Sequence, residues 1–311
     1  MEIVIRNLER KKTNLKFKFY ILVSILSFIS PMTSFADSNI ERGSYIAMAS
    51  GCKNCHSIPG NPDYSGGEKL ETSFGQLYAP NITPHIHNGI GKWTIQQFSR
   101  AVKKGISPKG TPYYPAFPYT HYSLMAKEDL ENLYHYFMSL PPANLKSKEH
   151  NLYFPFNLRF LLWIWRWIYI EDASQTVISI SKKYERGKYL IEGLGHCGVC
   201  HTQKNILGGS ISSLNLAGSL YRINNKIITV PNITTHKTMG IGNWDKDDII
   251  WFFKTGLLVD GDTVSGKMGD IIDESISSLS AYDIDSMATY LKSLPPLVNS
   301  KFKIIRTIDE D

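Results

Sequence analysis

Two pentapeptides of the form Cys-x-x-Cys-His contain every cysteine of the chain. Their members are Cys52, Cys55 and His56 in the first and Cys197, Cys200 and His201 in the second. Cysteines three positions apart lie on one face of a helix, and a histidine directly after the second can turn its ring to the same side. The pattern therefore predicts a group that is attached through two sulfurs while the imidazole binds its metal.

Three kinds of chemistry use cysteines at this spacing. A zinc site would have to gather its four ligands from pairs about 145 residues apart, and it leaves His56 and His201 without a role. A redox dithiol needs only one pair and no histidine. Covalent haem uses both cysteines for thioether bonds and the histidine as an iron ligand. We therefore predict two haem c groups, with His56 and His201 as the proximal ligands.

The sixth ligand of each iron must come from the opposite side of the haem, and in small cytochromes c it is usually methionine. Met268 has a suitable position in the second half, although packing in the core is the ordinary role of such a residue. The matching position in the first half holds Phe117, which cannot bind iron. Met125 is our prediction for the first haem, and His121 or a vacant sixth position are the alternatives.

The second half of the chain repeats four landmarks of the first half in the same order. They are Arg-Gly-x-Tyr, Pro-Asn-Ile-Thr, Gly-Ile-Gly-x-Trp and Ser-Leu-Pro-Pro, which begin at 42 and 186, 80 and 231, 89 and 240, and 139 and 293. This order indicates a duplication. We therefore predict two tandem cytochrome c-type domains, 37–150 and 184–311, joined by an aromatic segment, 151–183.

Apolar residues at helical spacing predict the helices of each domain. These helices cover Thr94 to Lys104, Lys127 to Leu140, Asp245 to Thr255 and Ala281 to Leu294. The segments between them are rich in Gly, Pro, Asn and Thr, and they show no alternation long enough to suggest a sheet. The expected fold is all-α, with each domain wrapping one covalently bound haem.

The first 36 residues have the composition of an export signal. Basic residues precede the apolar run 19–30, and small residues then lead to Ala36, after which we expect cleavage. This segment holds six of the 34 basic and two of the 28 acidic residues, so the remainder carries a formal charge of +2 instead of +6. Such a weak charge gives no reason to expect a nucleic-acid partner.

These motifs, together with the segments 79–84 and 114–119, make the chain resemble the multi-haem cytochrome c subunits of membrane-associated bacterial dehydrogenases. That family includes the subunits of quinoprotein alcohol dehydrogenase and flavin-dependent gluconate dehydrogenase. The resemblance implies periplasmic electron transfer from a separate dehydrogenase subunit toward a quinone-linked or oxidase-linked acceptor of the respiratory chain. It also implies Met268 as a distal ligand, and relatives with Phe at position 117 and Met at position 125 support Met125. Such subunits usually carry three haems, whereas this chain has two motifs.

Six further residues of the repeats have two interpretations each. The side chains of Asn81, Thr83, Asn232 and Thr234 could bind haem propionates or could cap their own loops. Trp93 and Trp244 could lie beside the haem or fill the core.

The segment 154–170 is the most apolar part of the chain after the signal. Its 17 residues would span about 25 Å as a helix, less than the roughly 30 Å of a membrane core. Arg159 and Arg166 would each cost roughly 2.5 to 3.5 kcal/mol near the bilayer centre, so a membrane-spanning helix is not expected. We expect the segment to fill the seam between the domains, with contact to a membrane surface or a partner protein as the alternative.

The sequence therefore predicts an electron carrier, since all strongly placed residues serve haem attachment or ligation. It contains no recognisable Ser/His/Asp set, phosphate-binding glycine loop or carboxylate pair. One alternative is a haem enzyme, a peroxidase or a thiosulfate-oxidising cytochrome, with catalysis at the first haem. Another is ligand sensing at an open haem. The sixth ligand of the first iron distinguishes these functions.

Overall fold

The computed structural model describes residues 32–67, 69–170, 182–223 and 226–301. The export signal predicted for residues 1–36 lies outside the described residues, except for 32–36. We call residues 32–170 the first half and 182–301 the second half. The helices are α2 (Met32–Ala49), α3 (Cys52–His56), α4 (Ile95–Lys104), α5 (Tyr119–Tyr122), α6 (Lys127–Ser139), α7 (Leu161–Tyr169), α8 (Lys183–Lys188), the π-helical turn η1 (Tyr189–Leu194), α9 (Gly198–His201), η2 (Ser212–Leu214), α10 (Lys246–Thr255), α11 (Gly266–Glu274), η3 (Ile276–Ser278) and α12 (Ala281–Ser293). The strands are β1 (Lys69–Thr72), β2 (Gly75–Tyr78), β3 (Asn151–Leu152), β4 (Ser219–Ile223) and β5 (Lys226–Val230).

The four helices predicted from apolar spacing are α4, α6, α10 and α12, and their bounds agree with the prediction to within one residue. The first turn of α4 explains its sharp start. The Thr94 hydroxyl accepts a hydrogen bond from the Gln97 amide, and the Gln97 side chain accepts one from the Thr94 amide. Such a capping box satisfies two donors that the helix leaves unpaired. Gly105 ends the helix in the left-handed conformation, with φ 61°.

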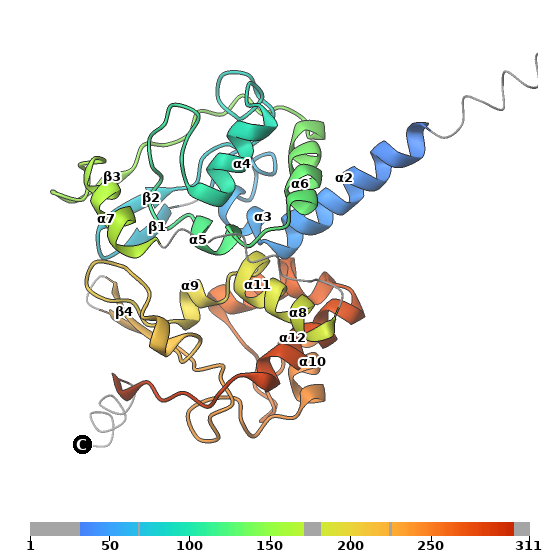
Figure 1. Ribbon diagram of the computed structural model, residues 1–311, viewed down its shortest axis with the longest axis vertical. Helices are drawn as coiled ribbons and strands as arrows, with labels where there is room; N and C mark the ends of the chain where they lie inside the picture. The colour runs from blue at the N-terminus through green and yellow to red at the C-terminus, as the bar shows by residue number, and fades with distance from the viewer. Residues whose placement is uncertain (1–31, 68, 171–181, 224–225, 302–311) are drawn as a thin grey trace, which may run out of the picture.

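The glycine of each Arg-Gly-x-Tyr landmark allows two helices to pack closely. A Cβ atom on Gly43 would lie 2.1 Å from the backbone oxygen of Asn132, and one on Gly187 would lie 1.9 Å from that of Ser286. These contacts bring α2 against α6 in the first half and α8 against α12 in the second half (Figure 1). The repeated sequence therefore forms the same helix pair twice.

The prediction of a fold without sheets is wrong in two places. Strands β1, β2 and β3 form an antiparallel sheet in the first half, and β4 and β5 form a hairpin in the second half. Strands β1 and β2 have only four residues each, too few to show a clear alternation of side chains. The helical framework is as expected, and the sheets lie among the loops that connect it.

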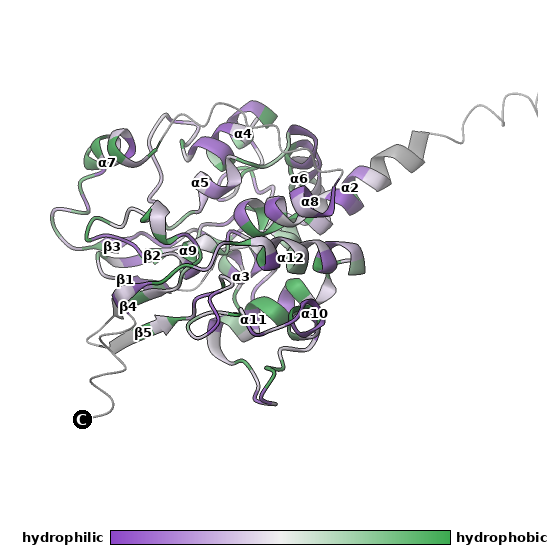
Figure 2. Ribbon diagram, turned by 60° about the horizontal axis from the view of Figure 1, so that its bottom comes forward, coloured by the Kyte–Doolittle hydropathy of each residue, from purple (hydrophilic) through white to green (hydrophobic). Residues whose placement is uncertain are grey.

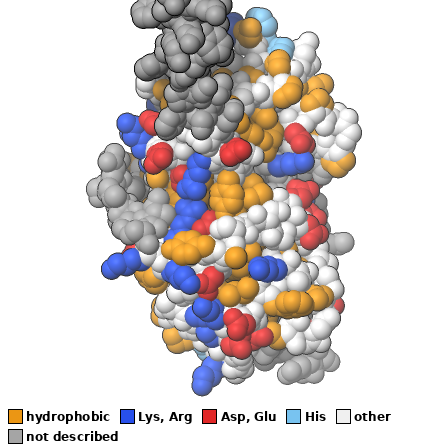
Figure 3. Space-filling view, turned by 90° about the vertical axis from the view of Figure 1, so that its right-hand side faces the viewer, with side chains coloured by type: hydrophobic (Ala, Val, Ile, Leu, Met, Phe, Trp, Pro, Cys, Tyr) orange, Lys and Arg blue, Asp and Glu red, His pale blue; other side chains and the backbone are white. Residues whose placement is uncertain are grey.

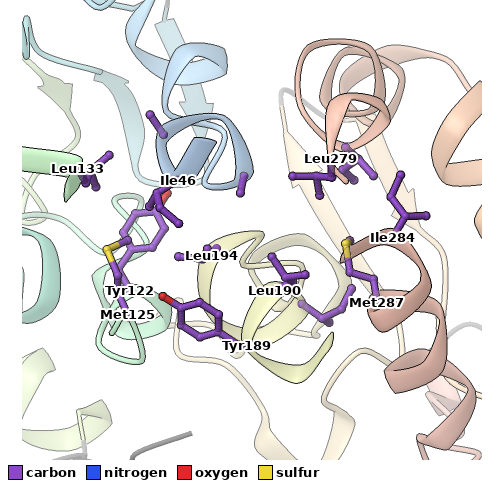
Figure 4. Packing of buried hydrophobic residues seen from close by; sticks show 14 of the residues in the cluster. Ile46, Tyr122, Met125, Leu133, Tyr189, Leu190, Leu194, Leu279, Ile284 and Met287 are labelled. Carbon is purple, nitrogen blue, oxygen red and sulfur yellow. The ribbon is translucent and has the colours of Figure 1, made fainter. Parts of the chain in front are cut away.

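The hydrophobic core is continuous between the two halves (Figure 4). Tyr122 and Met125 enter it from the first half, Leu190 and Leu194 from η1, and Met287 from α12. The two halves thus bury apolar surface against each other as well as within themselves.

The aromatic segment forms α7 at the edge of the molecule, where most of the helix is hydrophobic (Figure 2). One side contacts the second half, because the Trp165 indole donates to the Leu207 carbonyl and the Tyr169 hydroxyl accepts from Asn205. The other side is solvent-exposed, and 84% of Trp167 is accessible. Helix α7 therefore bridges the halves but fills the seam with one face only. Among the described residues, no helix combines the length and the apolar character needed to cross a membrane.

Candidate functional site

The first pentapeptide forms the short helix α3, which begins after Gly51 in the left-handed conformation. Nδ1 of His56 lies 2.7 Å from the carbonyl oxygen of Pro80. Because a carbonyl can only accept, Nδ1 carries the proton and donates it. Nε2 then keeps its lone pair and remains available to a metal ion. In histidines that bind metal, a hydrogen-bond acceptor at the other ring nitrogen fixes the tautomer and the orientation of the ring.

The second pentapeptide repeats this arrangement. Nδ1 of His201 lies 2.8 Å from the carbonyl oxygen of Pro231, the proline of the second Pro-Asn-Ile-Thr landmark. The backbone around the two histidines is also equivalent, because the Gly66 amide donates to the His56 carbonyl at 3.0 Å and the Gly218 amide donates to the His201 carbonyl at 2.7 Å. The duplicated sequence therefore forms two imidazole sites with the same free nitrogen.

All four cysteines lie in the described part of the chain, Cys52 and Cys197 partly buried and Cys55 and Cys200 exposed. Burial raises the pKa of the Cys52 thiol to about 12 and that of Cys197 also to about 12. Reactive dithiols need the opposite environment, one that stabilises a thiolate. Within the described ranges, no three side chains of His, Cys, Asp or Glu gather in a way that could hold a metal ion. The environment of Cys52 and Cys197 is therefore not that of an activated redox pair.

Met125 is almost completely buried, with 1% of its surface exposed. The peptide group that follows Met125 is held at both of its polar atoms: the Lys103 ammonium donates to the Met125 carbonyl at 2.9 Å, and the Ala126 amide donates to the Tyr189 hydroxyl at 3.1 Å. Met268 lies on α11 and packs half-buried against the core. Both predicted distal residues are thus in ordered, apolar surroundings.

His121, the alternative distal ligand of the first haem, is engaged with the second half. Its Nδ1 lies 2.7 Å from the carbonyl oxygen of Glu192. Its Cε1 packs against Gly198, at 3.0 Å from the position of an ideal Cβ there. The Nδ1 contact alone would leave Nε2 available, as in His56, but Cε1 lies between the two ring nitrogens, so this edge of the ring faces the second pentapeptide rather than the first.

The loop residues proposed for haem propionates are hydrogen-bonded within the protein. Asn81 Oδ1 accepts from the backbone and hydroxyl of Thr83, and its Nδ2 donates to the carbonyls of Ala143 and Leu145. Asn232 and Thr234 form the equivalent contacts in the second half. All four side chains are buried and hold the backbone of their own loops, which supports loop capping. Trp93 and Trp244 pack partly buried against the core.

Sequence reasoning missed the residues that link the two pentapeptides. The Tyr122 hydroxyl donates to the Ser50 carbonyl at 2.8 Å, just before the first pentapeptide. Its ring stacks on His196, just before the second, with ring centroids 5.5 Å apart and an angle of 21° between the planes. The only sequence signal was the position of His196 beside Cys197, which gives no indication of a partner about 74 residues earlier. The two motifs are therefore connected through a single side chain.

The surface on the side of α2 carries acidic, basic and apolar side chains in mixed order (Figure 3). This distribution agrees with the weak net charge of the chain outside the predicted signal.

Comparison with known proteins gives relatives over most of the chain, although no family model matches it. A diheme cytochrome c-type protein of Cereibacter sphaeroides is 37% identical over 262 residues, covering 83% of this chain and 86% of the relative. The gluconate 2-dehydrogenase cytochrome c subunit of Pantoea cypripedii is 35% identical over 87% of this chain, and the cytochrome c subunit of the quinone alcohol dehydrogenase of Gluconobacter oxydans is 35% identical over 84%. The chain spans 65% and 56% of the lengths of these two subunits. The chain therefore belongs to the family of haem-binding c-type cytochromes that contains these electron-transfer subunits.

Proposed function

We propose that this chain is a di-haem electron carrier that relays electrons from a dehydrogenase toward the respiratory chain. One haem is attached at Cys52 and Cys55 and the other at Cys197 and Cys200. When bound, each haem supplies a one-electron couple between ferric and ferrous iron. The two haems belong to tandem cytochrome c-type units, 37–150 and 184–311, joined by 151–183.

The observation that carries this proposal is the equivalence of the two imidazoles. Each donates its Nδ1 proton to a proline carbonyl, at 2.7 Å for His56 and 2.8 Å for His201, and each directly follows the second cysteine of its pentapeptide. This donor set fits haem c, because the thiols can form thioethers while Nε2 binds iron. A single such motif could serve one haem, and the repeated geometry supports two.

On the distal side we propose Met125 for the first haem and Met268 for the second. Burial of Met125 and its fixed backbone favour it over His121, whose ring is held by the second half. Methionine sulfur favours reduced iron and raises the reduction potential, which suits a relay.

Haem content and ligation test this function directly. The purified full-length chain should contain two haems, and changing Cys52 and Cys55 together to alanine should leave one. Near-infrared magnetic circular dichroism of the oxidised, unmodified protein should give two Met/His centres. One haem in the unmodified chain would refute the di-haem carrier, and a bis-His or five-coordinate centre would refute Met125 as the ligand.

We propose a dehydrogenase subunit as the electron donor and a quinone-linked or oxidase-linked protein as the acceptor, in the periplasm. Relatives named as cytochrome c subunits of gluconate, alcohol and fructose dehydrogenases support the donor. The predicted export signal supports the compartment. The names of these relatives also favour a carrier over a peroxidase or thiosulfate-oxidising enzyme with catalysis at the first haem.

The segment 154–170 is our candidate for contact with the membrane surface. Phe154 and Trp167 are 78% and 84% exposed, and Phe160, Trp163, Ile164 and Ile168 of the same segment are exposed as well. Tryptophan prefers the boundary between lipid and water, so such a face would bind there without spanning the membrane. Co-sedimentation with lipid vesicles should fall when Trp167 and Ile168 are changed to serine, and unchanged binding would refute this contact.

A further inference from the structure

The two Arg-Gly-x-Tyr landmarks form a reciprocal set of hydrogen bonds between the halves. In the first half, the Arg42 guanidinium donates twice to Asp129, at 3.0 and 2.9 Å. In the second half, the Arg186 guanidinium donates to both oxygens of Asp283, at 2.8 and 2.7 Å. Each arginine therefore pairs with an aspartate of its own half.

The tyrosines, in contrast, cross to the other half. The Tyr45 hydroxyl donates to Asp283 at 2.5 Å and accepts from the Ser280 amide at 3.1 Å. The Tyr189 hydroxyl donates to Asp129 at 2.8 Å and accepts from the Ala126 amide at 3.1 Å. Ser280 and Ala126 are the N-cap residues of α12 and α6. Each phenol therefore holds the start of the closing helix of the opposite half, and we call this arrangement the tyrosine clasp.

The environment makes these contacts specific. Asp129 and Asp283 each have 5% of their side chains exposed, and Tyr189 is 1% exposed. Inside a protein, a hydroxyl removed from water has to keep its hydrogen-bond partners, because an unpaired buried group is unfavourable. A phenol that donates to a carboxylate and accepts from a backbone amide satisfies both requirements in one orientation. The clasp therefore permits little rotation of one half relative to the other.

The clasp also connects to both haem sites. Ala126 directly follows Met125, so Tyr189 of the second half fixes the backbone next to the proposed distal ligand of the first haem. The halves meet again at the attachment motifs, because the Asn54 amide donates to Glu274 of α11 at 2.8 Å, and Tyr122 stacks on His196. Helix α11 carries Met268. The first motif therefore contacts the helix that carries Met268. His196, directly before the second motif, contacts Tyr122, three residues before Met125.

We propose that Tyr45 and Tyr189 are positioning residues for electron exchange between the two haems, an inference that rests on the di-haem function proposed above. The exchange moves one electron, so one iron is oxidised, the other is reduced, and no bond forms or breaks. Its rate depends on the separation and orientation of the two groups. The clasp fixes both by tying each closing helix to the opposite half.

The test uses the full-length protein with its haems and replaces the tyrosines by phenylalanine, singly and together. Tyr184→Phe is the matched control, because Tyr184 lies on α8 beside Arg186 and is 43% exposed. An electron injected by flash photolysis is followed as it redistributes between the haems. Amide hydrogen exchange at the starts of α6 and α12 reports the clasp without reference to the haems.

We expect Tyr45→Phe and Tyr189→Phe to slow the redistribution, and the double variant to slow it further, while Tyr184→Phe keeps the original rate. The amides of Ser280 and Ala126 should exchange faster in the matching single variants. Unchanged redistribution together with faster amide exchange would overturn the proposal, because the clasp would then be purely structural. Loss of haem in both single variants would also overturn it, since the tyrosines would then serve assembly. Fewer than two haems in the unmodified chain would instead refute the di-haem function itself.

Discussion

The buried ion pair between Arg186 and Asp283 is the contact whose loss should affect stability most. The side chains are 6% and 5% exposed, and they are joined by two short hydrogen bonds. The change Asp283→Asn removes the negative charge and leaves the buried guanidinium without its hydrogen-bonded carboxylate. Breaking a buried pair in this way typically costs about 3 to 5 kcal/mol of the free energy of unfolding. The loss corresponds to a fall of roughly 5 to 8 °C in the melting temperature of a chain of this size.

The change Asp285→Asn provides the comparison on the same helix. Asp285 forms ion pairs with Lys183 and Lys246, whose side chains are 51% and 47% exposed. Exposed pairs contribute only about 0.2 to 1 kcal/mol each. Guanidinium unfolding of the holoprotein, followed by tryptophan fluorescence, measures both variants. If Asp283→Asn destabilised the protein no more than Asp285→Asn, the buried pair would not have the strength that its geometry indicates.

Three further results are expected. The change Gly187→Ala should lower the free energy of unfolding by about 1 to 3 kcal/mol, because its Cβ would lie 1.9 Å from the Ser286 oxygen, and unchanged denaturant midpoints would contradict this packing. The change Lys103→Met removes the donor to the Met125 carbonyl and so loosens the backbone that carries the proposed distal sulfur. Because methionine sulfur raises the reduction potential, a redox titration should find the midpoint potential of the first haem lowered and that of the second unchanged. Burial raises the pKa of Asp283, but hydrogen bonds from Arg186 and Tyr45 outweigh it and hold the pKa below its usual value. The stability that this group contributes is therefore present above its ordinary pKa of about 3.9 and is lost as the pH falls through the lower folded pKa. Between pH 6 and pH 2, the melting temperature of Asp283→Asn should therefore fall less than that of the unmodified protein.

The helices α4, α6, α10 and α12 could be predicted from the sequence because apolar spacing is a local signal. The structure adds that Thr94 and Asp245 cap the first turns of α4 and α10. The two pentapeptides were recognisable for the same reason, since each lies within five consecutive residues, and their use for haem attachment stays a prediction. The hairpin of β4 and β5 was missed although its second strand contains the β-branched run 227–230, which favours strands.

The remaining features depend on contacts between distant residues. Nothing near Tyr189 in the sequence indicates that its hydroxyl meets Asp129, 60 residues earlier. The choice between propionate binding and loop capping at Asn81 was equally open, because the Ala143 and Leu145 carbonyls that decide it lie more than 60 residues away. Helix α7 has one face on the second half, as expected for the seam, and leaves the other face exposed. Composition describes a helix face but does not say what covers it.

The tyrosine clasp has the pattern of an isologous interface, in which residue i of one unit meets residue j of the other and j meets i. Two copies of a single unit form such a contact when they assemble as a symmetric dimer. In a dimer, every substitution is doubled, so both copies of a site change together. In a fused chain each position occurs once, and one site can change while its counterpart stays the same. Phe117 stands at the position of the first half that corresponds to Met268 in the second half, which is a difference of this kind. The joined chain can therefore hold two unequal centres on one symmetric framework.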